Sequence, residues 1–144
     1  MEITERLLLL ITAIIAASAA FFCMISLATP RWSFLSGLYC KGCPTAPAGL
    51  SIVALIFLIA LVLVLILIIL KILPKSIRFV CFLIIFLATV FTLAAHASYF
   101  DMVTGYSYKL MVFAHFLCYI ASILTAFWLG GSYAATVVIV PNNP

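Results

Sequence analysis

The run Leu61-Val-Leu-Val-Leu-Ile-Leu-Ile-Ile-Leu70 holds no polar side chain and forms the second half of a longer apolar segment, Leu50–Leu70. About 20 apolar residues in a helix are enough to cross the hydrocarbon core of a bilayer. Three other segments have the same character. The four predicted spans are Leu7–Ala28, Leu50–Leu70, Phe79–Ser98 and Leu110–Leu129. None of them alternates polar and apolar residues as the strands of a membrane barrel do, so we expect helices.

The composition also indicates a membrane protein. Of the 144 residues, 69% are hydrophobic and 7% are charged, whereas a soluble domain is about half apolar and about a quarter charged. The formal net charge of +4 comes from basic residues scattered at the ends of the apolar runs. There they set membrane topology and form no nucleic-acid-binding patch. The sequence therefore predicts an all-α membrane protein, in which residues 1–144 form a single four-helix transmembrane bundle in contact with membrane lipid.

The basic residues and two cysteines predict the orientation of the chain. Arg6, Lys71, Lys75 and Arg78 lie on one side of the predicted bundle, and Arg31, Lys41 and Lys109 lie on the other. The side with the excess is expected to be cytoplasmic. Cys40 and Cys43 favour an oxidising compartment for the first loop. We therefore expect a multi-pass protein of the plasma membrane with both termini in the cytoplasm and outer loops at 29–49 and 99–109.

The first span has a second interpretation as a signal peptide. Ala17-Ser18-Ala19 resembles a cleavage site. The apolar run around it is longer than the apolar region of a signal peptide, so we expect a retained helix.

The first outer loop contains Cys40-Lys41-Gly42-Cys43. A Cys-x-x-Cys pair can be a redox site, and four helices with such a pair resemble the bacterial quinone-linked disulfide-forming membrane oxidoreductases. Those enzymes carry a second cysteine pair in the other outer loop, and Tyr99–Lys109 contains no cysteine. A thiol oxidoreductase is therefore the alternative. We expect a structural disulfide, because a four-residue turn brings two Cα atoms within bridging distance.

Two histidines, His96 and His115, fall inside the predicted spans. Ionisable groups within a membrane are candidate functional residues. Both lie in the outer halves of antiparallel helices, so we expect them to approach each other near the outer surface. A polar pair that hydrogen-bonds the helices is the expectation, and a pH-sensing or metal-binding pair is the alternative. Two histidines without a third ligand make a poor zinc site, so we predict no bound metal.

Short motifs in both outer loops resemble those of one superfamily. Trp32 followed by Gly37-Leu38-Tyr39-Cys40 and then Cys43 resembles the W-GLW-C-C signature of the claudin, peripheral myelin protein and epithelial membrane protein superfamily. Gly105-Tyr106-Ser107-Tyr108 is similar to the motif that begins the fourth helix in that superfamily. The resemblance implies that loop 29–49 forms a small extracellular β-hairpin, that Cys40 and Cys43 are disulfide-bonded, and that Trp32 lies against the bundle.

The predicted function is non-enzymatic. The chain has no nucleotide-binding or hydrolase motif and no Asp or Glu inside the predicted spans, so we expect no catalytic residue and no cofactor. The resemblance implies an auxiliary subunit of a larger channel or receptor, or a membrane or junction organiser that binds copies of itself. We expect Leu61–Leu70 to contact lipid and the third and fourth helices to contact the partner. The possible partner contacts in the outer loops are Tyr99, Phe100, Tyr106 and Tyr108.

Overall fold

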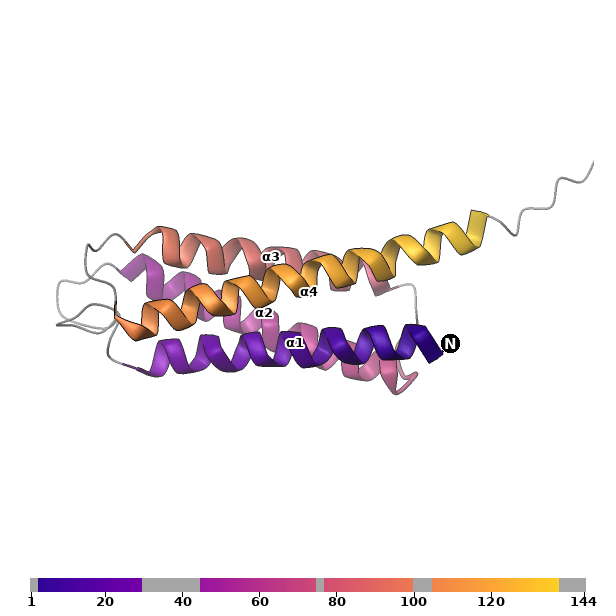
Figure 1. The fold of residues 1–144 in the computed structure, drawn as a ribbon, viewed down its shortest axis with the longest axis horizontal. Coiled ribbons are helices and arrows are strands. Elements are labelled where there is room, and N and C mark those ends of the chain that lie inside the picture. The colour runs from indigo at the N-terminus through magenta and orange to yellow at the C-terminus, as the bar shows by residue number, and fades with distance from the viewer. Residues whose placement is uncertain (1–2, 30–44, 75–76, 100–104, 138–144) are drawn as a thin grey trace, which may run out of the picture.

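The computed structural model describes residues 3–29, 45–74, 77–99 and 105–137. They form four helices, α1 (Ile3–Ala28), α2 (Thr45–Ile69), α3 (Arg78–Ala97) and α4 (Tyr106–Val137). The helices run up and down side by side (Figure 1), and α1 and α3 each pack against both α2 and α4. All four are long and apolar enough to cross a membrane. The predicted all-α, four-helix architecture is therefore confirmed for the described residues.

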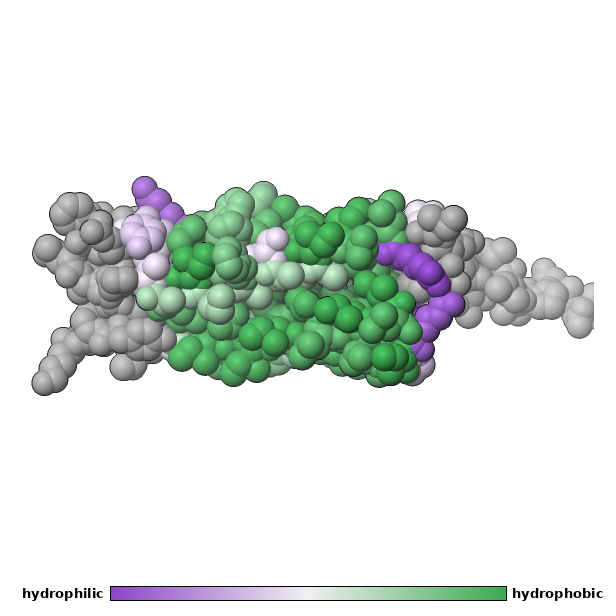
Figure 2. Space-filling model, turned by 90° about the horizontal axis from the view of Figure 1, so that it is seen from below, coloured by the Kyte–Doolittle hydropathy of each residue, from purple (hydrophilic) through white to green (hydrophobic). Residues whose placement is uncertain are grey.

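The two ends of the bundle differ. At the end that we call the N-terminal end, α1 begins and a short turn joins α2 to α3 (Figure 1). The opposite end, which we call the two-loop end, carries the connections from α1 to α2 and from α3 to α4. Between the ends the surface is apolar, and hydrophilic residues gather at both ends (Figure 2). An apolar band of this kind, together with the four helices, indicates a multi-pass membrane protein.

Apart from Ala13 and Ala48, the buried residues of the described helices follow one spacing, with alternating steps of three and four positions. The buried series are Leu9, Thr12, Ala16, Ala19, Cys23 and Ser26 in α1; Pro47, Ser51, Ala54, Leu58, Leu61, Leu65 and Ile68 in α2; Cys81, Ile85, Ala88, Thr92 and Ala95 in α3; and Ser107, Met111, Ala114, Cys118, Ala121, Thr125 and Trp128 in α4. A repeat of about 3.5 residues is typical of left-handed coiled coils and four-helix bundles.

Small side chains make up most of these series in α1, α3 and α4. Lipid tails are as apolar as leucine, so helices in a membrane associate through close packing, which small residues allow. In α2, by contrast, Leu58, Leu61 and Leu65 fill the core, while Leu63 and Leu70 point outward and are 57% and 61% exposed. One face of the run Leu61–Leu70 therefore packs in the core, and its outward face is the part available to lipid.

α2 begins earlier than predicted, at Thr45 instead of Leu50. Pro47 lies in its first turn, where a backbone N–H has no partner within the helix, so proline costs no hydrogen bond. Ser51 lies in the second turn, is buried, and donates its hydroxyl hydrogen to the Pro47 carbonyl over 2.7 Å.

α4 is longer than predicted at both ends. It begins at Tyr106 instead of Leu110 and continues through Gly130 and Gly131 to Val137. Each glycine lowers helix stability by about 1 kcal/mol relative to alanine, but that cost does not end the helix here. α4 therefore extends beyond its neighbours at the N-terminal end (Figure 1).

The turn after α2 has a defined cap. Lys71 adopts a left-handed conformation, with φ of 61°. The amide of Ile72 donates to the Leu67 carbonyl over 3.0 Å, and the amide of Lys71 donates to the Ile68 carbonyl over 3.0 Å. These two bonds form a Schellman motif, which satisfies carbonyls at the helix end. The position is one that glycine usually occupies.

The first outer loop lies largely outside the described residues. The expected β-hairpin, the Cys40–Cys43 disulfide and the residues of the signature (Trp32, Gly37, Leu38 and Tyr39, with the two cysteines) all fall within 30–44, which the structure does not describe. The described ranges contain no strand.

Candidate functional site: polar contacts between the helices

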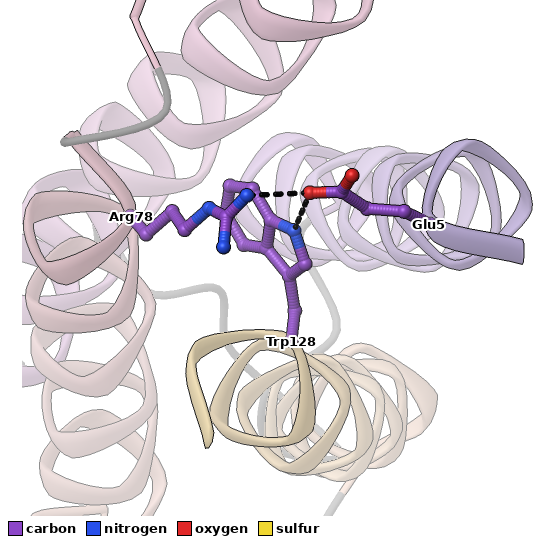
Figure 3. A network of polar contacts seen from close by, with 3 residues as sticks. All are labelled: Glu5, Arg78 and Trp128. Carbon is purple, nitrogen blue, oxygen red and sulfur yellow. Dashed lines mark hydrogen bonds and ion pairs between the residues drawn. The ribbon is translucent and has the colours of Figure 1, made fainter. Parts of the chain in front are cut away.

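The N-terminal end of the bundle holds a charged cluster of Glu5, Arg78 and Trp128 (Figure 3). Glu5 extends from α1, and its Oε1 accepts hydrogen bonds from Nη2 of Arg78 in α3 over 2.6 Å and from Nε1 of Trp128 in α4 over 3.1 Å. The guanidinium carbon of Arg78 lies 5.0 Å from the centroid of the Trp128 ring, within the range of a cation–π contact. One carboxylate thus joins three helices.

This cluster is only partly accessible to solvent. The side chains of Arg78 and Glu5 are 14% and 19% exposed, and Trp128 is 4% exposed. Glu5 lies in the first turn of α1, where the helix dipole favours a negative charge. Within the described part of the chain, Arg78 Nε is the buried side-chain polar atom that lacks a hydrogen-bond partner.

This cluster was not predicted from the sequence. Arg78 was interpreted there only as a determinant of topology, and neither Glu5 nor Trp128 was expected to form a site. A signal was nevertheless present, because the starts of the first and third helices and the end of the fourth lie together in an up-and-down bundle. An acid, a base and a tryptophan at those three positions can therefore meet.

A second set of polar contacts joins α3 to α4 nearer the two-loop end. The hydroxyls of Thr89 and Ser122 lie 2.9 Å apart. One turn further along α3, Thr92 Oγ1 lies 3.0 Å from Nδ1 of His115. The carbonyl of Thr92 lies 2.8 Å from Nδ1 of His96. Thr92 therefore contacts both histidines, although the sequence analysis gave it no role.

The structure brings His96 and His115 together, with ring centroids 5.0 Å apart and ring planes tilted by 58°. The Tyr108 ring lies edge-on to His96 at 6.4 Å, and Tyr99 lies 5.9 Å from Tyr108. Of the predicted partner contacts, Tyr99 and Tyr108 are thus partly buried against the core, while Tyr106 is 47% exposed. Phe100 lies outside the described residues.

A third set joins α1 to the start of α4 at the two-loop end. The Ser26 hydroxyl donates to the Ser107 carbonyl over 2.8 Å. The hydroxyls of Thr29 and Ser107 lie 2.7 Å apart. Thr29 donates its own hydrogen to the Ile25 carbonyl over 2.7 Å, so Ser107 is the donor between the two hydroxyls. Ser107 belongs to the Gly-Tyr-Ser-Tyr motif, and this geometry gives it a structural role.

Three cysteines lie in the core of the described part of the chain. Cys23, Cys81 and Cys118 are buried and carry no disulfide. Cys23 donates a weak hydrogen bond from its thiol to the Ser51 carbonyl over 3.7 Å, which links α1 to α2. Burial among apolar groups makes a thiol unreactive, so these residues act as small core side chains.

No protein-family model, curated protein or solved structure matches this chain. Its chemistry must therefore be inferred from its own geometry. Within the described ranges, no group of three or more His, Cys, Asp or Glu side chains could hold a metal ion. Each of the polar clusters described above connects neighbouring helices.

Proposed function

We propose that this chain is a non-enzymatic, claudin-like membrane protein that acts by lateral contact. In this proposal it is an auxiliary subunit of a larger channel or receptor, or an organiser of the membrane at cell junctions. The observation that carries the proposal is the use of its polar side chains in contacts between different helices. Glu5 and Arg78, the Thr92–His115 contact and Ser107 all bond across helices. Such an arrangement favours a rigid scaffold over a catalyst.

The outer surface of α4 supports docking on another membrane protein. Its exposed side chains include several aromatic rings, Phe113 at 48%, Phe116 at 57%, Tyr119 at 56% and Phe127 at 71%. Aromatic side chains are enriched at protein interfaces. Tyr119 lies near the middle of the candidate span Tyr106–Gly131, where lipid offers its hydroxyl no hydrogen bond. A partner helix with a polar side chain would supply one.

Near the C-terminal end of α4, this surface also allows another helix to approach closely. A Cβ atom added to Gly130 or Gly131 would meet no other atom within 4 Å. Together with Ala126, Gly130 forms a small-xxx-small pair, which lets two helix backbones approach in lipid. The exposed face of α2, by contrast, carries aliphatic side chains such as Ile56 and Leu63, 61% and 57% exposed. We propose that this face of α2 contacts lipid and that α4 contacts the partner.

Site-specific photo-crosslinking in native membranes tests the docking face. A crosslinking residue replaces Phe116 or Tyr119 on α4, and the matched controls replace Ile56 or Leu63, which have similar exposure. After purification in mild detergent, mass spectrometry identifies the products. We expect protein adducts from the α4 positions and few from α2. Adducts concentrated at the α2 positions would refute the proposal.

The same experiment separates the two roles. An auxiliary subunit gives adducts with one larger membrane protein at a fixed ratio. An organiser gives adducts with further copies of this chain.

The proposal extends to the outer loop. In this proposal the segment 30–44 contains the β-hairpin, Cys40 and Cys43 close it with a disulfide, and both termini lie on the cytoplasmic side of the plasma membrane. Alkylation of protein from native membranes, read by mass spectrometry, tests the pairing. We expect both thiols to be protected until a reductant is added. Thiols that cycle with added quinone would favour the alternative, a membrane thiol–disulfide oxidoreductase using Cys40 and Cys43.

A further inference from the structure

The hydrogen bonds of His96 fix its tautomer. Nδ1 of His96 lies 2.8 Å from the carbonyl oxygen of Thr92. A carbonyl only accepts hydrogen bonds, so Nδ1 carries the proton. The other ring nitrogen, Nε2, therefore holds a lone pair in the neutral ring.

The tautomer of His115 follows from a shared hydroxyl. Thr92 Oγ1 lies 2.9 Å from the Thr89 carbonyl and 3.0 Å from Nδ1 of His115. A hydroxyl has one hydrogen, and the Thr89 carbonyl can only accept. When Thr92 donates to that carbonyl, Nδ1 of His115 donates to Thr92 Oγ1. In this arrangement His115 also has its lone pair on Nε2.

With Nδ1 carrying the proton in each ring, Nε2 holds the lone pair that a metal ion would bind. Histidine ligands of metals commonly donate the proton of the other ring nitrogen to a carbonyl or a similar acceptor, which fixes the tautomer and the ring. No hydrogen bond between the described residues occupies either Nε2. One residue, Thr92, orients both rings through its carbonyl and its hydroxyl.

The separation of the rings fits a shared ion. Zinc holds imidazole nitrogens about 2.0–2.1 Å away in a tetrahedral arrangement, which puts two ligand rings about 5 Å apart, centroid to centroid. The observed separation is 5.0 Å. We propose, in place of the prediction from the sequence that this pair binds no metal, that His96 and His115 form a two-imidazole site for a divalent transition-metal ion of the zinc and copper class. The two remaining positions are for water, because no third His, Cys, Asp or Glu of the described residues joins the pair.

The surroundings favour a cation. His96 lies in the last turn of α3, where the helix dipole attracts positive charge. Both histidines are partly exposed, and His96 lies close to the two-loop end. This inference goes beyond the proposed function, since an ion here would link α3 to α4 directly. Because the protein supplies two ligands, we expect weaker binding than at a four-ligand structural zinc site.

Metal titration of the full chain tests the site. The protein is purified in metal-free buffer, reconstituted in lipid nanodiscs, and treated with an alkylating agent so that no free thiol at Cys40 or Cys43 can bind the ion. ZnCl₂ or CuSO₄ is then added in a calorimeter. We expect one ion per chain, with Cu²⁺ bound more tightly than Zn²⁺ and no binding of Mg²⁺. His96→Gln and His115→Gln should each weaken binding at least tenfold.

Two further variants keep the test specific. Ser122→Ala removes a neighbouring contact between α3 and α4 without touching either histidine, so it should leave metal affinity unchanged. Thr92→Val removes the acceptor for His115 while keeping the carbonyl for His96, so it should weaken binding less than loss of a ring. Wild-type affinity in both histidine variants would overturn the proposal, as would no binding by the folded wild-type protein at millimolar metal. If His115→Gln fails to fold, His96→Gln alone decides, because the hydrogen bond that the His96 ring makes among the described residues lies within its own helix.

Discussion

Oε1 of Glu5 lies 2.6 Å from Nη2 of Arg78 and so connects the first turn of α1 to the first residue of α3. Glu5→Gln keeps an oxygen for Trp128 but removes the charge that faces Arg78. We expect the free energy of unfolding to fall by about 1–3 kcal/mol, because hydrogen bonds to charged groups contribute about that much. Denaturant unfolding in detergent micelles measures it. Arg6→Gln, at an exposed position one residue further on, should change stability by less than about 0.5 kcal/mol.

The pairing of Glu5 with Arg78 also predicts non-additivity. Each single change, Glu5→Gln or Arg78→Gln, leaves the opposite charge partly buried without its partner, whereas the double change removes both charges. The double variant should therefore lose less stability than the sum of the two single variants, by about 0.5–3 kcal/mol. Simple additivity in this double-mutant cycle would show that the two side chains do not interact in solution.

Two adjacent alanines of α1 differ in burial because of the spacing of the core residues. Ala16 is 0% exposed and belongs to the core series, whereas Ala17 faces outward. Ala16→Leu forces a larger side chain into a packed core and should destabilise the bundle by about 1–3 kcal/mol. Ala17→Leu should be tolerated. Thermal unfolding of the two variants in the same detergent makes the comparison, and equal effects would contradict the assigned core face.

Two serines of α1 make different kinds of hydrogen bond, one between helices and one within a helix. Ser26 donates to the Ser107 carbonyl of α4, whereas Ser18 donates to the Ile14 carbonyl of its own helix. Hydrogen bonds between membrane helices are worth about 0.6 kcal/mol on average and about 1.7 at most. Ser26→Ala should cost a value in that range, while Ser18→Ala should cost almost nothing. Equal unfolding midpoints for the two alanine variants would count against the α1–α4 contact.

The left-handed conformation of Lys71 predicts a stabilising substitution. A side chain at φ of 61° is disfavoured, and glycine adopts this conformation without that cost. Lys71→Gly should therefore raise the free energy of unfolding by up to about 1 kcal/mol, while Lys71→Val should lower it. Unfolding curves of both variants provide the measurement, and a stabilising valine would contradict the turn geometry.

The four helices could be predicted from the sequence because each contains enough apolar residues to cross a bilayer. Their core faces were harder to predict. In a helix such as α2, where almost every residue is apolar, the contrast between core and surface disappears, so Leu61 and Leu63 look alike in sequence although one is 0% and the other 57% exposed. The spacing of small residues carries the information in α1 and α4 instead.

The polar clusters also differ in how far they could be predicted from the sequence. His96 and His115 could be expected to approach each other because antiparallel neighbours place their outer halves together. Their tautomers could not be predicted, since they depend on the two contacts that Thr92 makes. The cluster around Glu5 was missed because its three members lie at the helix ends, where charged residues are usually interpreted as determinants of topology.

α4 and α3 differ greatly in length, with 32 and 20 residues. At 1.5 Å per residue they measure about 48 Å and 30 Å. Because the two helices meet at the two-loop end, α4 projects beyond α3 at the N-terminal end (Figure 1). A short helix outside a bundle has marginal stability in water, so it opens independently of the core. Amide hydrogens after Gly131 should consequently exchange with solvent orders of magnitude faster than those between Ser107 and Trp128.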